Sequence, residues 1–156
     1  MSVSPQPVPI GDLPGHYIRR LQQIAVGLFM EETQVFGLTP VQFGALNAII
    51  EHPGIDQSTM AARIGFDTST IGGVVDRMEA RGWVVRKVAA QDRRLRQLFA
   101  TTAGEQLLQD VKASVLHTQE RILAPLTAQQ RPEFLRMLKL LVETNNDASR
   151  APRSEV

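Results

Sequence analysis

The densest group of chemically active side chains in the sequence is a cationic run at positions 81–96. It contains six arginine or lysine residues and one acidic residue, Asp92, so the run carries a net charge of +5 in a chain whose net charge is +1. Cations at this density bind phosphate, and the pattern is typical of proteins that bind nucleic acid. A solvated charged surface is the alternative. The six cations are Arg81, Arg86, Lys87, Arg93, Arg94 and Arg96.

The residues around these cations predict a β-hairpin. Positions 83–88 are rich in β-branched and aromatic residues, and positions 96–100 provide a return strand. The charged tip at 89–94 would then project from the body as a wing. A long side chain there, such as that of Arg94, can enter a minor groove, where the potential is most negative. Asp92 would repel phosphate, so we expect it to pair with an arginine inside the tip and stiffen the turn.

Two short helices in quick succession precede the hairpin. Asp56 can cap the first, which ends at Gly65, and Asp67 can cap the second, which ends at Gly82. The short glycine-containing link between them is what a helix-turn-helix requires. A plain helical hairpin in an all-helical bundle is the alternative, and the strand that follows argues against it. We therefore expect a winged helix-turn-helix.

The second of these helices has one apolar stripe and one polar side. Ile71, Val74, Val75 and Met78 recur at helical spacing and face the core, whereas hydroxyl groups gather at the first turn. Hydroxyl groups and free backbone N–H groups at a helix start suit base edges and phosphates. Gly72 and Gly73 are compatible with close approach either to DNA or to another helix. The predicted DNA contacts are Thr68, Ser69, Thr70, Gly73, Arg77, Arg86, Lys87, Arg93, Arg94 and Arg96.

The rest of the chain is mostly helical, which makes the fold mainly α with a small β-wing: six helices and one hairpin. Predicted caps outside the helix-turn-helix are Asp12, Thr39, Thr101 or Thr102, and Thr127. The long terminal helices are more apolar than the small middle lobe can cover, so we expect a symmetric homodimer; packing only on each other is the alternative. The expected divisions are a disordered arm at 1–13, a dimerisation helix at 14–38, the DNA-binding domain at 39–100, dimerisation helices at 101–147 and a flexible tail at 148–156.

The composition argues against several other functions. The chain has no cysteine, and its three histidines, His16, His52 and His117, lie far apart with no spacing typical of a metal site or a catalytic motif. We therefore predict no enzyme activity, no cofactor and no bound metal. No apolar run approaches the roughly 20 residues that span a bilayer, and the N-terminus lacks the features of a signal peptide, so we expect no membrane association and a cytoplasmic location.

One stretch carries a family resemblance. Over positions 92–104, Asp92, Arg94, Thr101 and Gly104 match in register the wing signature of MarR-type regulators, with Ala100 where leucine is usual. The chain resembles that family over about 14–147. The resemblance implies a homodimer on a palindromic operator, with recognition helices in major grooves and wings in minor grooves. It also implies a ligand cleft between the dimer base and the DNA-binding domain, often for an aromatic carboxylate or phenol.

Four residues are candidates for that cleft. His16 and Arg20 lie four apart with Tyr17 adjacent, and Asn47 interrupts an apolar run. Arginine can hold a carboxylate through two hydrogen bonds, and the two rings can stack on an aromatic ligand. A solvent-facing helix start and an exposed asparagine are the alternatives. The chain is also similar to regulators of aromatic-acid catabolism, among them repressors of nicotinate degradation, which implies a repressor released by 6-hydroxynicotinate. A ligand-independent regulator, a metal-responsive regulator and a protein-interaction module remain open.

Overall fold

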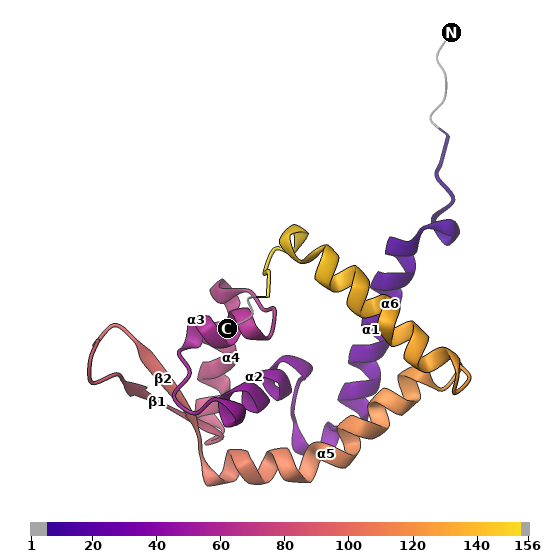
Figure 1. Cartoon of the computed structure of the whole chain (residues 1–156). Helices are drawn as coiled ribbons and strands as arrows, with labels where there is room; N and C mark the ends of the chain where they lie inside the picture. The colour runs from indigo at the N-terminus through magenta and orange to yellow at the C-terminus, as the bar shows by residue number, and fades with distance from the viewer. Residues whose placement is uncertain (1–5, 154–156) are drawn as a thin grey trace.

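Within residues 6–153 the chain forms six α-helices and one two-stranded antiparallel hairpin, as predicted (Figure 1). The computed structural model describes residues 6–153, so residues 1–5 of the expected arm and 154–156 of the expected tail lie outside it. The helices are α1 (Pro14–Glu32), α2 (Pro40–Glu51), α3 (Gln57–Arg63), α4 (Thr68–Ala80), α5 (Thr102–Leu123) and α6 (Gln130–Thr144), and the strands are β1 (Val84–Val88) and β2 (Arg96–Ala100). Short 3-10 turns occupy Ile10–Asp12, Gln34–Phe36 and Asn146–Ala148.

Most predicted helix caps are confirmed. Thr39 forms a reciprocal capping box with Gln42, and the side chains of Asp56, Asp67 and Thr101 accept backbone N–H groups at the starts of α3, α4 and α5. These caps are local hydrogen bonds between residues two or three apart, which explains why sequence spacing finds them.

Two helix starts differ from the prediction. Asp12 does not cap α1, because it lies inside a 3-10 turn and Leu13 occupies the N-cap position without a side-chain bond. The last helix begins at Gln130, after a turn. Thr127 nevertheless caps that turn, because its hydroxyl accepts the N–H of Gln130 while the Gln130 side chain accepts the N–H of Thr127.

The end of α1 is also earlier than predicted. The buried hydroxyl of Thr33 donates to the carbonyl of Phe29 (2.8 Å) and lies within 3.1 Å of the carbonyl of Leu38, which draws the following turn back onto the helix end. Gly37 then adopts a left-handed backbone conformation (φ 63°) and reverses the chain into α2.

The hydrophobic core lies where α2, α4, β2 and α5 meet. Its fully buried side chains come from every one of these elements, so α2 is enclosed by the recognition region on one side and the long helix α5 on the other. The largest of them are Leu38, Leu46, Ile49, Met60, Ile71, Met78 and Leu98.

The base of the hairpin is fixed along its β2 edge and closed across its two ends. Along the edge, the N–H of Gly54 donates to the carbonyl of Leu98 (2.8 Å) and the N–H of Leu98 donates to the carbonyl of Ile55 (2.9 Å). Across the ends, the Thr101 hydroxyl donates to the carbonyl of Gly82 (2.6 Å). The wing therefore leaves the body at a fixed angle, and only its tip is free of the core.

Helix α5 starts against the backbone at the wing base. A methyl group on Gly104 would lie 2.1 Å from the carbonyl oxygen of Trp83, and that oxygen already accepts the N–H of Thr101 (3.0 Å). Backbone atoms cannot yield as a flexible side chain would, so glycine is required here for a close approach. This glycine is one of the positions that carried the family resemblance.

Helices α1 and α5 are held together by an ion-pair network. The carboxylate of Glu32 lies 2.9 Å from Nδ1 of His117 and 2.6 Å from a guanidinium nitrogen of Arg121. Hydrogen bonds from these two side chains lower the pKa of Glu32, and the bond from His117 has the larger effect.

None of the described helices is long and apolar enough to cross a membrane.

We predict that Gly104→Ala lowers the free energy of unfolding by roughly 3 kcal/mol, because the added methyl group must displace the start of α5 from the wing base. Gly27→Ala is the matched control. It adds a methyl group in open space within α1 and should leave stability unchanged or raise it by roughly 0.5–1 kcal/mol. Urea unfolding measures both. Equal stability of the two variants would contradict the close contact.

Candidate nucleic-acid interface

The N-terminus of α4 presents its hydroxyl groups to solvent. Asp67 caps the helix by accepting the N–H of Ser69 (2.9 Å), and this bond is the main reason why the pKa of Asp67 is lowered. Thr68, Ser69 and Thr70 are exposed, whereas Ile71 in the same turn is buried. The hydroxyl side of α4 is therefore free to meet a ligand such as a DNA groove.

The two adjacent glycines of α4 have different surroundings. A methyl group on Gly72 would contact the side-chain amide of Gln57 at 3.4 Å, so this glycine lies at the contact between α3 and α4. A methyl group on Gly73 would instead lie 3.5 Å from the guanidinium group of Arg77. Helix packing therefore accounts for Gly72, and Gly73 leaves room for the exposed Arg77.

The side chain of Arg86 points toward α3 and α4, which the sequence did not predict. Its guanidinium group is 2.6 Å from the carboxylate of Asp76, and it also donates to the carbonyl of Gly72 (3.2 Å) and to the side chain of Gln57 (3.4 Å). Only 21 % of the side chain is exposed. Arg86 thus connects β1 to both helices of the helix-turn-helix, and its donors face inward in this structure.

Arg81 is also engaged within the fold. It donates to the carbonyl of Phe36 (3.2 Å), and its guanidinium group stacks over the ring of Trp83 at 4.5 Å. Arg81 is nevertheless exposed, as are Lys87, Arg93, Arg94 and Arg96, whereas Arg86 is partly buried. The cationic surface is therefore smaller than the sequence count suggested, because Arg86 faces inward.

The wing tip is a hydrogen-bonded turn. The carboxylate of Asp92 accepts the N–H of Arg94 (2.9 Å), and the backbone carbonyl of Asp92 accepts the N–H of Leu95 (3.1 Å). The side chain of Arg96 donates to the carbonyl of Arg93 (3.2 Å). Asp92 bonds here to the backbone of an arginine, which leaves the Arg94 guanidinium group out of that contact.

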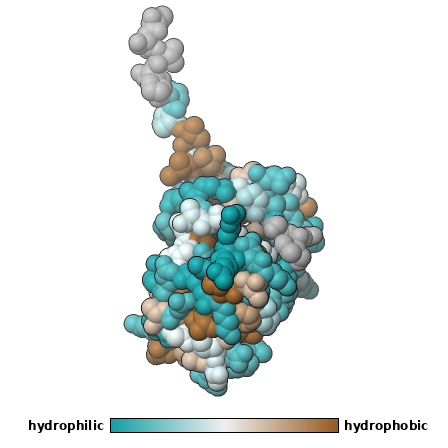
Figure 2. Space-filling model, turned by 90° about the vertical axis from the view of Figure 1, so that its left-hand side faces the viewer, coloured by the Kyte–Doolittle hydropathy of each residue, from teal (hydrophilic) through white to brown (hydrophobic). Residues whose placement is uncertain are grey.

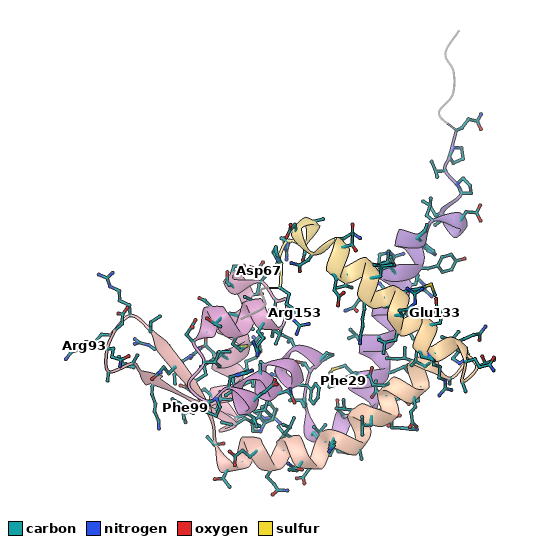
Figure 3. All side chains as sticks on the ribbon, in the orientation of Figure 1. Phe29, Asp67, Arg93, Phe99, Glu133 and Arg153 are labelled. Atoms are coloured by element: carbon teal, nitrogen blue, oxygen red, sulfur yellow. The ribbon has the colours of Figure 1, made fainter. Side chains whose placement is uncertain are left out.

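The exposed cations are distributed along the hairpin. Arg93 projects from its end (Figure 3), and Lys87 lies over the ring of Phe99 at 4.8 Å, nearer the wing base. The face that carries the wing is mostly hydrophilic (Figure 2). A capped helix start with exposed hydroxyl groups and a cationic hairpin fixed beside it form a surface suited to a DNA groove and its flanking phosphates.

Several known proteins are similar to this chain in both sequence and fold. The model of the MarR family matches residues 36–95, which include the helix-turn-helix and most of the wing. The regulator PcaV of Streptomyces coelicolor, solved with its natural ligand, is 32 % identical; the match covers 88 % of this chain and 97 % of that one, with a TM-score of 0.79. The chain belongs to the MarR family.

Two further MarR-type structures are informative. The repressor CouR of Rhodococcus jostii, solved on a 23-mer DNA duplex, is 27 % identical over 89 % of this chain and 99 % of that one, with a TM-score of 0.80. BpsR of Bordetella bronchiseptica, whose DNA binding is regulated by 6-hydroxynicotinic acid, reaches a TM-score of 0.81 at 22 % identity, over 87 % of this chain and 97 % of that one. This last similarity shows a shared fold and leaves the effector of the present regulator to be determined.

The structure does not bring the four predicted ligand residues together within one chain. Asn47 is exposed on α2 and borders a pocket of about 330 Å³ between α2 and α5, named here the effector cleft. His16 and Tyr17 contact each other edge to face at 5.4 Å, but they lie at the other end of α1. Helix α1 meets α2 at Phe29, whose ring contacts that of Phe43. Arg20 lies nine residues earlier, about 14 Å away along the helix axis, and is therefore far from this cleft.

Sequence reasoning missed the cation of this cleft. Its walls are Phe43 and Asn47 from α2 and Leu108, Lys112, Val115 and Leu116 from α5. Lys112 is one helical turn from both Leu108 and Leu116, so a search for a single cation within an apolar helical row would have found it.

Within residues 6–153, no group of three or more His, Asp or Glu side chains is placed to hold a metal ion. His117, which is the histidine nearest to carboxylates, is occupied in the α1–α5 network described above. No observation among the described residues therefore favours the metal-responsive alternative.

We predict that Arg94→Ala weakens binding to all duplex sequences and lowers the slope of log K against log salt concentration by about 0.9, the loss of one phosphate contact. Fluorescence anisotropy with a labelled duplex at several salt concentrations measures both quantities. An unchanged slope would show that Arg94 does not contact a phosphate.

Arg86→Met is the paired variant, and we predict a different effect. Affinity should fall because α4 and the wing lose their connection, while the salt slope stays at the parent value because Arg86 does not reach phosphate. A thermal melt of the same variant should show lower stability. A slope reduced as in Arg94→Ala would assign Arg86 to the DNA instead.

Proposed function

We propose that this MarR-family regulator is a homodimeric repressor that binds a palindromic operator and is released by a small aromatic acid. The observation that carries the proposal is the joining of a capped helix start, with Thr68, Ser69 and Thr70 exposed, to a cationic wing held at a fixed angle. The wing would lie along the minor groove while α4 enters the major groove. CouR, which has the same fold, is a repressor solved on DNA.

The homodimer is supported by apolar surface that the chain itself leaves uncovered. Helix α6 contains no buried residue, and its apolar residues Leu140 and Val142 are 55 % and 66 % exposed. Helix α1 likewise exposes Tyr17, Ile18 and Ile24. Large exposed apolar surfaces mark interfaces, and a two-fold pairing of terminal helices would cover both at once. Two copies would also place two recognition helices for the two halves of a palindrome.

The effector cleft supports an aromatic acid as the ligand. It combines an aromatic wall, Phe43, with one cation, Lys112, and two amides, Asn47 and Gln109. A planar ring can stack on the first while its carboxylate pairs with the second. His16, Tyr17 and Arg20 would join this site from the partner's α1, because their own helix holds them too far away. The first effector to test is 6-hydroxynicotinate.

Release would follow from differential binding. The cleft lies between α2, which belongs to the DNA-binding part, and α5, which leads to the terminal helices. A ligand that prefers one relative position of these helices shifts the dimer toward that position, and DNA affinity falls by the ratio of its affinities for the two states. A ligand that binds both positions equally would have no effect.

We predict that an aromatic acid weakens DNA binding at least tenfold in the parent protein and has little effect on Lys112→Met. The DNA is a duplex that the protein selects from a random library. The ligands tested are 6-hydroxynicotinate, benzoate and acetate, and acetate serves as the carboxylate that lacks a ring. Gel shifts measure affinity, and sedimentation of the free protein measures its oligomeric state.

Three outcomes would contradict the proposal. Failure to bind any duplex at low ionic strength removes the regulator, and a monomer at micromolar concentration removes the dimer. Binding to DNA that no aromatic acid changes would favour the ligand-independent alternative.

A further inference from the structure

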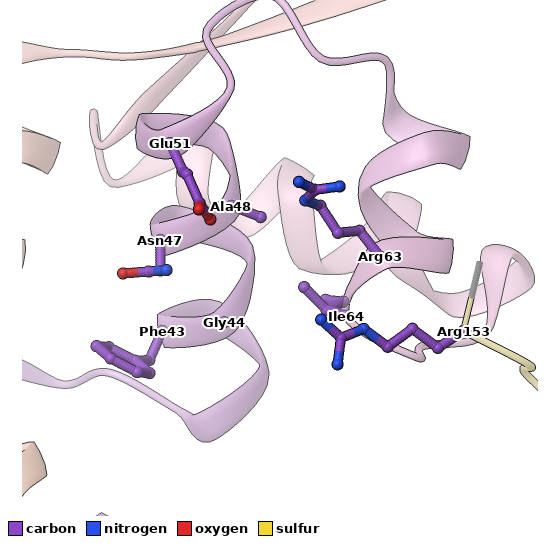
Figure 4. Close-up of a pocket in the computed structure, with 8 residues that line it drawn as sticks. All are labelled: Phe43, Gly44, Asn47, Ala48, Glu51, Arg63, Ile64 and Arg153. Atoms are coloured by element: carbon purple, nitrogen blue, oxygen red, sulfur yellow. The ribbon is translucent and has the colours of Figure 1, made fainter. Parts of the chain in front are cut away.

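One arginine of the recognition helix differs from the other arginines around it. Arg63 extends from α3 toward α2, where it contacts Nε2 of His52 (Figure 4), and Arg81 and Arg86 bond within the fold as described above. Arg77 is exposed on α4, and its side chain has no hydrogen bond, ion pair or ring contact with any residue that the structure describes. Its five N–H donors are therefore available to a ligand.

The guanidinium group of Arg77 lies back along the surface of α4. A methyl group on Gly73 would lie 3.5 Å from one of its nitrogens, and Gly73 precedes Arg77 by one helical turn. Long side chains on a helix point toward its N-terminus, as this one does. Because Gly73 has no side chain, the guanidinium group can lie there, closer to the exposed hydroxyl groups of the first turn.

This guanidinium group lies on the side of α4 opposite the core. Ser69, Gly73 and Arg77 are spaced by four residues and therefore form one row along the helix. Successive residues turn by 100°, which places the row opposite the buried side chains of Ile71 and Val75. When a recognition helix enters a major groove, the side opposite its core faces the edges of the bases.

The acidic residues of α4 do not neutralise Arg77. The helix contains two, Asp76 and Glu79. The carboxylate of Asp76 lies 2.6 Å from the guanidinium group of Arg86, and that of Glu79 accepts the N–H of Arg86 (3.2 Å). Both carboxylates are thus turned toward β1, and the positive charge of Arg77 faces the groove without a partner among the described residues.

The base that suits such a group is guanine. A guanidinium group only donates hydrogen bonds, and its planar fork fits two acceptors that lie side by side. In the major groove guanine presents two acceptors, N7 and O6, whereas adenine presents N7 beside the donor N6. Adenine would therefore place a donor against a donor.

We propose that Arg77 reads one guanine in each operator half-site through paired hydrogen bonds to N7 and O6, and that Gly73 positions it by leaving room for the guanidinium group. This inference rests on the operator binding proposed above and adds base specificity to it. The wing cations supply affinity for any duplex, because phosphates carry no sequence information. Arg77 supplies a preference for sequence.

The experiment uses the duplex that the protein selects from a random library. Each guanine is replaced in turn by 7-deazaguanine, which pairs normally with cytosine but has a C–H in place of the acceptor N7. At one position in each half-site the replacement should weaken binding by the parent protein about fivefold or more. The same replacement should change binding by Arg77→Met less than about twofold. Fluorescence anisotropy measures both.

Two further variants separate this role from a general loss of affinity. Arg94→Ala should bind every duplex more weakly and keep the parent's sensitivity to 7-deazaguanine. Gly73→Leu fills the space beside the guanidinium group and should lose that sensitivity. A melting curve for each variant confirms that it is folded.

Three results would overturn the inference. They are a parent protein that is insensitive to every replacement, an Arg77→Met variant that is as sensitive as the parent, and a Gly73→Leu variant that keeps full sensitivity. A salt slope lowered by Arg77→Met, with the sensitivity kept, would assign Arg77 to a phosphate instead. Failure of the parent to bind any duplex would count against the proposed function itself.

Discussion

The geometry of the DNA-binding surface depends on one guanidinium group. Arg86 leaves strand β1 and bonds to Asp76 and to the carbonyl of Gly72 on α4, and to Gln57 on α3. The N–H of Arg86 also donates to the carboxylate of Glu79 on α4 (3.2 Å), and the two elements meet again at their shared end, where Gly82 reverses the chain. A helix and a hairpin that enter neighbouring grooves must keep a fixed separation, and this bridge sets it. Arg86 therefore has a positioning role in this structure, and the exposed cations of the wing are the ones that we expect to contact phosphate.

The same constraint connects the surface to the rest of the molecule. The base of the wing packs against the first turn of α5, where Gly104 allows close contact with the carbonyl of Trp83. Helix α5 then runs to the Glu32 network with α1, toward the surfaces proposed for the dimer. Displacement of α5 relative to α2 would thus be transmitted to α4 and the wing together. A ligand between α2 and α5 is well placed to cause such a displacement.

Local features of the structure were predictable from the sequence, and contacts between distant segments were not. The caps at Thr39, Asp56, Asp67 and Thr101 depend on bonds to residues within three positions, so their spacing is visible in the chain. Asp12 had the right residue type but does not cap α1, because it lies inside a 3-10 turn and Leu13 occupies the N-cap position. The hairpin followed from its composition, because β-branched and aromatic residues are concentrated in its strands.

The functional residues divide in the same way. A count of charges could not show that Arg86 faces inward, because its partners Asp76 and Gln57 lie in other elements of the fold. The ligand prediction met the same limit. It selected His16, Tyr17 and Arg20 from their spacing on one helix, whereas Lys112 reaches the effector cleft only through the packing of α5 against α2.

Hydrogen–deuterium exchange of the chain with and without a DNA duplex tests the central claim most directly. If α4 and the wing form one surface that meets DNA, the duplex should slow exchange together in the first turn of α4 and in the hairpin at 86–96, with no change in α6. Protection of α6 or of α1 without protection of α4, or protection of the hairpin alone, would contradict the account.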